Sequence, residues 1–249
     1  MIRPCLTALA TSLCLSLPAQ ALDIVGMTEA ERTVFRAEVR AYLLDNPQVI
    51  MEAVAVLEQH EQAAQKQTDV DLVSANSADL FNDGYSWAGG NPQGDITLVE
   101  FMDYRCGYCR KAFDEVERLI ELDGDIRFVI KEFPILGKES ELSSRFAIAT
   151  QQLAGDDAYK ATHDALITFT GPINDTSLGR IADTLGLDGP AILGHMNSDQ
   201  VTGVITKNRE LAGRMRISGT PSFVMDDQML RGYLPLQGMM QMAEDIRAN

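Results

Sequence analysis

The chain has 249 residues, of which 45% are hydrophobic, and it carries 36 Asp and Glu against 21 Lys and Arg, a formal net charge of −15. This acidic balance disfavours nucleic acid and anionic membrane surfaces as partners, because both would repel it. It is typical of a well-solvated surface. The length exceeds what one small core requires, so we expect one ordinary domain with an appendage.

Residues 1–21 have the pattern of an export signal. Arg3 supplies the positive n-region, residues 6–17 form an apolar h-region, and Ala19-Gln-Ala21 places small residues where a signal peptidase requires them. We expect cleavage after Ala21 and a periplasmic location. A lipid anchor on Cys14 is disfavoured by the Leu that precedes it. Retention as a membrane anchor is disfavoured by the short h-region.

Cleavage would leave Cys106 and Cys109 as the only cysteines, since Cys5 and Cys14 belong to the signal. A disulfide between two thiols so close in sequence closes a very small loop and adds little stability. Reactivity therefore explains the pair better than structural cross-linking does.

Residues 22–80 have a helical pattern. Thr28 and Glu31 form a capping-box sequence, and Asn46-Pro47 ends the first helix and starts a second. The apolar face comprises Val34, Phe35, Val39, Tyr42, Leu43, Ile50, Val54 and Leu57. This face must be buried, either against the following domain or against copies of the same chain. We favour self-association.

Residues 81–95, rich in Gly, Asn and Asp, are expected to form a linker in which Trp87 anchors to the domain over residues 96–249. Strands are predicted at residues 96–102, 126–131, 222–225 and 229–233, with helices at 110–122, 140–153, 157–168, 177–185, 190–196, 199–214 and 236–247. This order predicts an α/β thioredoxin fold with a mixed sheet and a helical insertion over about residues 139–197.

Cys106 is expected where a strand ends and a helix begins, so its thiolate would face unpaired backbone N–H groups and the positive end of the helix dipole. We therefore expect Cys106 to be the nucleophile and Cys109, one turn further along, to be the resolving thiol of a redox-active Cys106–Cys109 disulfide. A zinc half-site is the structural alternative. It lacks further ligands, because His60, His163 and His195 show no paired spacing.

Thr220-Pro221 precedes the hairpin. Proline at the start of an edge strand is an ordinary occurrence. Downstream of a CxxC pair, however, we favour a cis bond beside the thiols, which lets the Thr220 backbone pair with an extended substrate.

Glu100 alternates with apolar residues on a predicted buried strand, six residues before Cys106. Buried carboxylates are rare unless they are paired or functional. Glu100 is a candidate to accept the Cys109 proton through water, with a pKa raised by burial. The alternative is an ion pair with Lys131 on the neighbouring strand, and the two hypotheses are compatible.

Three segments together resemble the DsbA family of periplasmic thiol–disulfide proteins, most closely its ScsC-type branch: Phe101-Met-Asp-Tyr-Arg-Cys-Gly-Tyr-Cys-Arg-Lys111, Lys131-Glu-Phe-Pro-Ile-Leu-Gly137 and Gly219-Thr-Pro-Ser-Phe223. The resemblance implies a thioredoxin fold with a helical insertion, a CxxC site, a Thr–cis-Pro loop and no cofactor. In some members the N-terminal helices form a dimer or trimer, and copper tolerance is associated with the branch.

Gly107-Tyr108 departs from the Pro-His dipeptide of DsbA itself and resembles that of the isomerase DsbC, which also has Thr before its cis-proline. A weaker oxidant than DsbA is therefore expected. We favour a disulfide isomerase or reductase that acts on exported client proteins and is kept reduced by a membrane redox partner. The alternatives are a dithiol oxidase and, in a different class, a chaperone-like or copper-binding protein. A copper ion would be held by the two thiols, with Met239, Met240 and Met242 as further candidates.

Overall fold

A computed structural model describes residues 26–248, so the predicted signal and its cleavage after Ala21 lie outside the described residues. The chain divides between Gln59 and His60 into two compact units, each of which is described by itself. None of the helices within residues 26–248 combines the length and apolar character that a membrane span requires.

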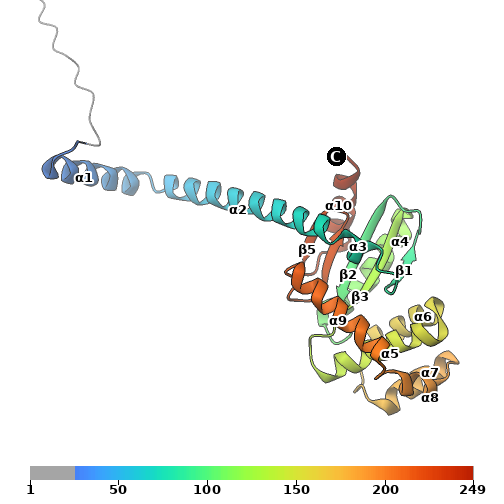
Figure 1. Ribbon diagram of the computed structural model, residues 1–249. Helices are drawn as coiled ribbons and strands as arrows, with labels where there is room; N and C mark the ends of the chain where they lie inside the picture. Colours follow the sequence, from blue (N-terminus) through green and yellow to red (C-terminus); the bar gives the residue numbers. More distant parts are fainter. Residues whose placement is uncertain (1–25, 249) are drawn as a thin grey trace, which may run out of the picture. The chain divides into compact units, whose positions relative to one another are not determined.

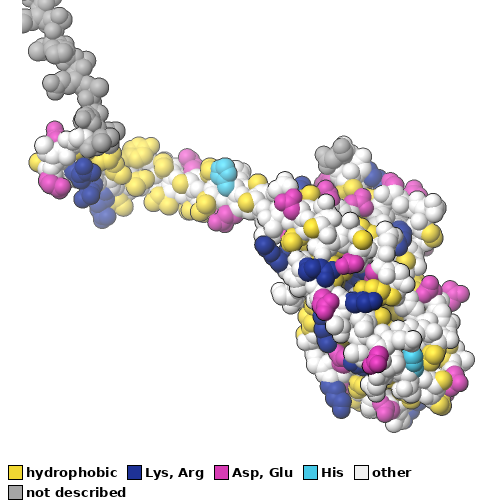
Figure 2. Space-filling model, in the orientation of Figure 1, with side chains coloured by type: hydrophobic (Ala, Val, Ile, Leu, Met, Phe, Trp, Pro, Cys, Tyr) yellow, Lys and Arg dark blue, Asp and Glu magenta, His cyan; other side chains and the backbone are white. Residues whose placement is uncertain are grey.

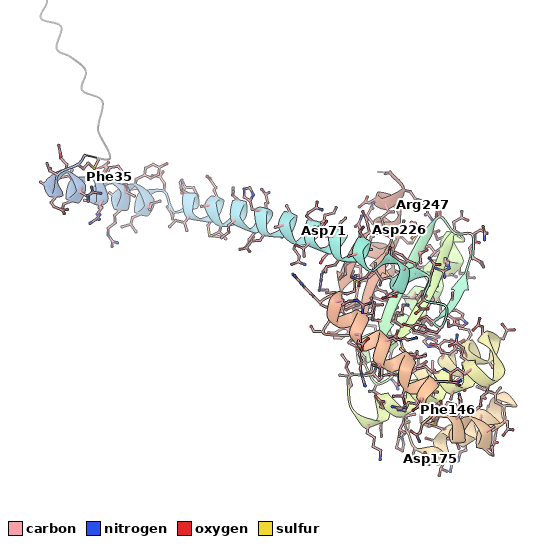
Figure 3. All side chains as sticks on the ribbon, in the orientation of Figure 1. Phe35, Asp71, Phe146, Asp175, Asp226 and Arg247 are labelled. Carbon is pink, nitrogen blue, oxygen red and sulfur yellow. The ribbon has the colours of Figure 1, made fainter. Side chains whose placement is uncertain are left out.

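The first unit consists of α1 (Glu29–Asp45) and the first turns of α2 (Gln48–Ala75). The predicted capping box is confirmed, since the Thr28 N–H donates to Glu31 Oε2 (2.8 Å) and the Glu31 N–H donates to Thr28 Oγ1 (3.4 Å). No residue of α1 is buried. Figure 2 shows apolar side chains along this unit, and Phe35 is labelled among them in Figure 3. The large exposed ones are Val34, Phe35, Val39, Tyr42, Leu44, Ile50, Met51, Val54, Val56 and Leu57.

The second unit is built on a five-stranded mixed sheet in the order β1-β3-β2-β4-β5 (Figure 1). Its strands are β1 (Trp87–Gly90), β2 (Ile96–Met102), β3 (Ile126–Glu132), β4 (Ser222–Met225) and β5 (Gln228–Arg231). The central strands β2 and β3 are parallel, and the other three pairings are antiparallel. The predicted α/β thioredoxin fold with a mixed sheet is confirmed.

Both faces of the sheet are covered, which explains why β2 and β3 are almost entirely apolar. On one face, Leu98 and Met102 of β2 pack in a core with α4 (Gly107–Asp123) and α10 (Leu236–Ala248). On the other face, Val99 and Phe101 pack in a core with α3 (Ser77–Phe81) and α9 (Asp199–Arg214). Alternate residues of β2 therefore belong to different cores.

The insertion between β3 and α9 comprises α5 (Lys138–Ala154), α6 (Asp156–Thr168), α7 (Asp175–Leu185) and α8 (Gly189–His195). Figure 1 shows these helices gathered on one side of the sheet. The last helix, α10, is fastened by Arg247 (Figure 3), whose guanidinium donates to Asp95 and Asp123 at 2.7–2.8 Å.

The boundaries differ from those expected for a helical segment over residues 22–80 and a linker over residues 81–95. The second unit begins at His60, and Val73 and Leu80 are buried in its core. Asp69 of α2 accepts two hydrogen bonds from Arg231 of β5 (2.7 and 2.8 Å). Trp87 packs on Phe128 and Tyr159, as expected for an anchor. It is, however, the first residue of the edge strand β1 and does not belong to a linker.

Candidate active site

Cys106 lies between β2, which ends at Met102, and α4, which begins at Gly107. It is the N-cap residue of α4, with extended backbone angles (φ −76°, ψ 118°), and its N–H donates to the Asp103 carbonyl (3.0 Å). Cys109 lies in the first turn of α4 and is buried. Both are free thiols, so the pair is in its reduced form.

The pKa values of the two thiols are shifted in opposite directions. The pKa of Cys106 is lowered to about 5, mainly by hydrogen bonding from the Cys109 thiol. The Thr220 side chain and the N–H groups of Cys109 and Tyr108 lower it further, whereas burial opposes the shift. The pKa of Cys109 is raised, first by burial and then because its thiol donates to Cys106. At neutral pH the site therefore holds one reactive thiolate and one protonated thiol.

The loop before β4 lies against the reactive sulfur. The Thr220–Pro221 peptide bond is cis. In the thiol form, Cys106 Sγ donates to the Thr220 carbonyl oxygen (3.1 Å). Two backbone contacts hold this loop in place. The Gly232 N–H donates to the Pro221 carbonyl (3.0 Å), and Ser222 pairs with Phe101 of β2.

Glu100 is buried in the middle of β2, between Ile130 of β3 and Phe223 of β4. Its pKa is raised to about 8, first by burial and then by the negative charges of the Cys106 thiolate, Glu117 and Glu132. The predicted ion pair with Lys131 is wrong. Lys131 points to the other face of the sheet, where its Nζ donates to Asp83 Oδ2 (2.5 Å) and to the Asp79 carbonyl (2.7 Å).

Asp103, which the sequence analysis missed, organises the turn into the CxxC pair. Its buried carboxylate accepts the Arg105 N–H at Oδ1 (2.8 Å) and the N–H groups of Ile135 and Leu136 at Oδ2 (2.8 and 3.0 Å). It therefore ties the turn before Cys106 to the loop after β3. The available signal was an Asp directly after a buried strand, where a side chain commonly accepts from the backbone two residues on.

A second missed group is the buried carboxylate of Glu132 at the end of β3. Tyr104 and Tyr159 donate to its Oε1 (2.7 and 2.6 Å), and Ser144 donates to Oε2 (2.6 Å). Burial raises the pKa of Glu132 to about 7. It lowers the pKa of nearby His163 to about 3, and His163 Nδ1 lies 3.1 Å from the Tyr104 hydroxyl oxygen. Glu132 thus joins the residues before Cys106 to α5 and α6 of the insertion.

Exposed apolar side chains lie on the CxxC segment and on the loop that Asp103 joins to it. Tyr108, between the two cysteines, has 61% of its surface exposed, and Ile135 and Leu136 are 38% and 53% exposed. Large apolar side chains exposed on these two segments favour contact with another polypeptide.

The methionines proposed as copper ligands lie on α10. Met239 is buried in the core and Met242 packs against it, so both act as core residues. Within residues 26–248 no cluster of three or more His, Cys, Asp or Glu side chains could hold a metal ion.

Two family descriptions match the chain. A "DSBA-like thioredoxin domain" matches residues 97–244, more than half of the chain. A "Copper resistance protein ScsC N-terminal domain" matches residues 31–64. The second match covers the exposed apolar segment of the first unit.

Two solved structures and one curated relative illustrate the similarity. A thioredoxin-like oxidoreductase from Silicibacter pomeroyi DSS-3 is 38% identical, with a TM-score of 0.65, and the match covers 69% of this chain and 98% of that one. Proteus mirabilis ScsC in a transitional conformation is 23% identical (TM-score 0.65; 90% and 98% covered) and shows the same fold.

The curated relative is Na(+)/H(+) antiporter NhaA 3 of Salinispora tropica, 26% identical over 150 residues. The match covers 60% of this chain and only 23% of that relative. The chain belongs to the DsbA-like family of thioredoxin-fold thiol–disulfide oxidoreductases, and an ScsC-type N-terminal domain precedes its thioredoxin domain.

Proposed function

We propose that the protein is a periplasmic disulfide isomerase or reductase in which Cys106 attacks wrong disulfides of exported client proteins. The observation that carries this proposal is the arrangement of Cys106: a thiol at a helix N-cap, 3.1 Å from the carbonyl of a cis-proline loop, with a pKa of about 5. Such a group is a thiolate at neutral pH and is ready to attack.

The exchange begins when the Cys106 thiolate attacks one sulfur of the client disulfide. The client S–S bond breaks, a client thiolate leaves, and a Cys106–client disulfide forms. In isomerisation, another client thiolate displaces Cys106. In reduction, Cys109 loses its proton and its thiolate attacks Cys106 Sγ. The Cys106–client bond breaks, the second client thiolate leaves, and the Cys106–Cys109 disulfide forms, so that two electrons have passed to the client.

Glu100 is proposed to accept the Cys109 proton through water. The Cys106 thiolate contributes to the raised pKa of Glu100. Once Cys106 is in the mixed disulfide, that negative charge is gone and the Glu100 pKa falls. The carboxylate form, which accepts the proton, therefore becomes more populated at the step that requires it.

The acidity of Cys106 supports the proposed direction of electron flow. Its pKa of about 5 lies between the values of roughly 7 for thioredoxin and 3.5 for DsbA. A less stabilised thiolate makes the disulfide form a weaker oxidant than DsbA. Isomerisation requires the reduced pair, so a membrane reductant is the expected redox partner.

The exposed apolar segment of the first unit is proposed to form a homo-oligomer. The match to the "Copper resistance protein ScsC N-terminal domain" over residues 31–64 covers this segment. Burial of exposed side chains such as Val34, Phe35 and Leu44 would supply the driving force. Sedimentation of residues 22–249 should give a dimer or trimer, and Phe35→Glu should shift it toward monomer.

Recovery of scrambled ribonuclease tests the main proposal. The mature protein should restore ribonuclease activity, Cys106→Ser should abolish this recovery, and removal of residues 22–59 should reduce recovery while leaving simple thiol exchange intact. A protein that only oxidises reduced substrates and never reshuffles wrong disulfides would be the alternative dithiol oxidase. The redox state of the pair in cells separates the two, since an isomerase is mostly reduced.

Copper binding is the alternative from another class. Copper titration of the double variant Cys106→Ser/Cys109→Ser tests it, because unchanged affinity would exclude the thiols as ligands.

A further inference from the structure

Two tyrosine rings lie together at the CxxC segment. Tyr108 is the residue before Cys109, and its ring centroid lies 6.0 Å from that of Tyr233, at an interplanar angle of 32°. Tyr233 follows β5, so the two rings come from different elements. Tyr108 remains 61% exposed despite this contact, so much of its ring is available to another molecule.

The position of Tyr233 is fixed by several contacts. Its hydroxyl donates to Glu115 Oε1 (2.5 Å), and Lys111 Nζ lies 4.2 Å from its ring centroid. Glu115 Oε2 also accepts the N–H of Leu236 at the start of α10 (2.7 Å). Tyr233 is therefore held against α4 by contacts to two of its side chains.

The same loop is joined to the cis-proline loop. The residue before Tyr233, Gly232, donates its N–H to the Pro221 carbonyl (3.0 Å), and Thr220 lies against Cys106 Sγ. An extended client segment placed along Thr220, with its cysteine at Cys106, would have a neighbouring side chain next to the two rings.

We infer that Tyr108 and Tyr233 form a specificity subsite that receives an aromatic side chain adjacent to the client cysteine. This inference rests on the proposed function and names the class of client that the site prefers. The Tyr233 hydroxyl is already bound to Glu115, so ring surface is what the pair offers. The charges of Lys111 and Glu115, which both contact Tyr233, offset one another, so the rings favour neither a cationic nor an anionic side chain.

The test uses disulfide-linked homodimers of one short peptide, with either Trp or Ser next to the single cysteine. Because the dimers are symmetrical, attack on either sulfur gives the same products. The rate of peptide thiol release by the reduced mature protein is measured for each dimer. The wild type should react faster with the Trp dimer by about 2- to 12-fold, the range expected from one aromatic pair.

Three variants make the result specific. Tyr233→Ala should bring the Trp-to-Ser rate ratio close to one, whereas Tyr233→Phe should keep it, because the ring remains. Leu122→Ala, which truncates an exposed apolar side chain near the far end of α4, should also keep it. Equal wild-type rates for the two dimers, or an equal slowing of both by Tyr233→Ala, would overturn the subsite.

The outcome also separates this inference from the proposed function. Exchange with both dimers at equal rates removes only the aromatic subsite. Failure of the wild type to exchange with either dimer removes the proposed function, and the subsite with it.

Discussion

The carboxylate of Glu100 and the ammonium group of Lys131 are both buried on adjacent central strands, yet they lie on opposite faces of the sheet. Glu100 pairs in register with Ile130, so the side chain of the next residue, Lys131, points to the opposite face of the sheet. Lys131 is neutralised by Asp83, whereas Glu100 lies near the CxxC pair, and no ion pair links it to a cation within residues 26–248. This separation leaves Glu100 available for proton transfer.

Replacement of Glu100 by Gln should stabilise the reduced protein while slowing its chemistry. The unfolded chain releases this proton near pH 4.5, but the folded protein keeps it until about pH 8, so unfolding releases a proton in between and stability falls as pH rises through that window. Glu100→Gln removes this loss, about 3 kcal/mol at pH 7. Urea unfolding between pH 5 and pH 8 measures it.

The same variant should resolve the Cys106 mixed disulfide more slowly, as followed by rapid mixing, because no carboxylate accepts the Cys109 proton. Lys131→Met serves as the control on the opposite face, with an unchanged resolution rate. Equal resolution by wild type and Glu100→Gln would contradict the proton-transfer role.

Cys109 should control the acidity of Cys106. Its thiol is the largest contribution that lowers the Cys106 pKa to about 5. Cys109→Ala should therefore raise the Cys106 pKa markedly, and Cys109→Ser, which keeps a hydrogen-bond donor, should raise it less. The pH dependence of thiolate absorbance or of alkylation rate measures both. A wild-type Cys106 pKa in Cys109→Ala would show that the Cys109 thiol is not the stabilising group.

The parts of the site that the sequence predicted are those encoded locally. The CxxC pair, the cis-proline loop and Glu100 each follow from a short motif next to a predicted strand. Glu132 could not be identified in this way, because its partners Ser144 and Tyr159 lie on helices that only the folded insertion brings to it. The division at Gln59 was missed for a related reason, since the buried Asp69 of α2 acquires its partner, Arg231, from a distant strand.

The buried pair of Lys131 and Asp83 should respond asymmetrically to mutation. Asp83 also accepts hydrogen bonds from the N–H groups of Tyr85 and Ser86 and from the Ser86 hydroxyl, so Lys131→Met leaves it well satisfied. Asp83→Ala leaves the buried ammonium group of Lys131 without its carboxylate partner, while the hydrogen bond to the Asp79 carbonyl remains. We expect a loss of about 3 kcal/mol or more for Asp83→Ala and a smaller loss for Lys131→Met. Thermal unfolding measures both, and the reverse order would contradict this account.

Glu132 should behave as a pH-sensitive connection between the thioredoxin core and the insertion. Its pKa is raised from 4.5 to about 7 by burial, so the folded state holds a proton that the unfolded chain has lost, and stability falls as pH rises from about 4.5 to 7. Glu132→Gln should flatten the pH dependence of stability in that window while keeping the fold, because the amide oxygen still accepts from Tyr104 and Tyr159.

Glu132→Leu leaves three buried hydroxyls without the Glu132 carboxylate as their acceptor, and it should lower the free energy of unfolding by about 3 kcal/mol or more. The Glu132 contribution is isolated by measuring the free energy of unfolding against pH for the Glu100→Gln protein, with and without Glu132→Gln. If the pH dependence is the same in the double variant, Glu132 is ionised throughout the window.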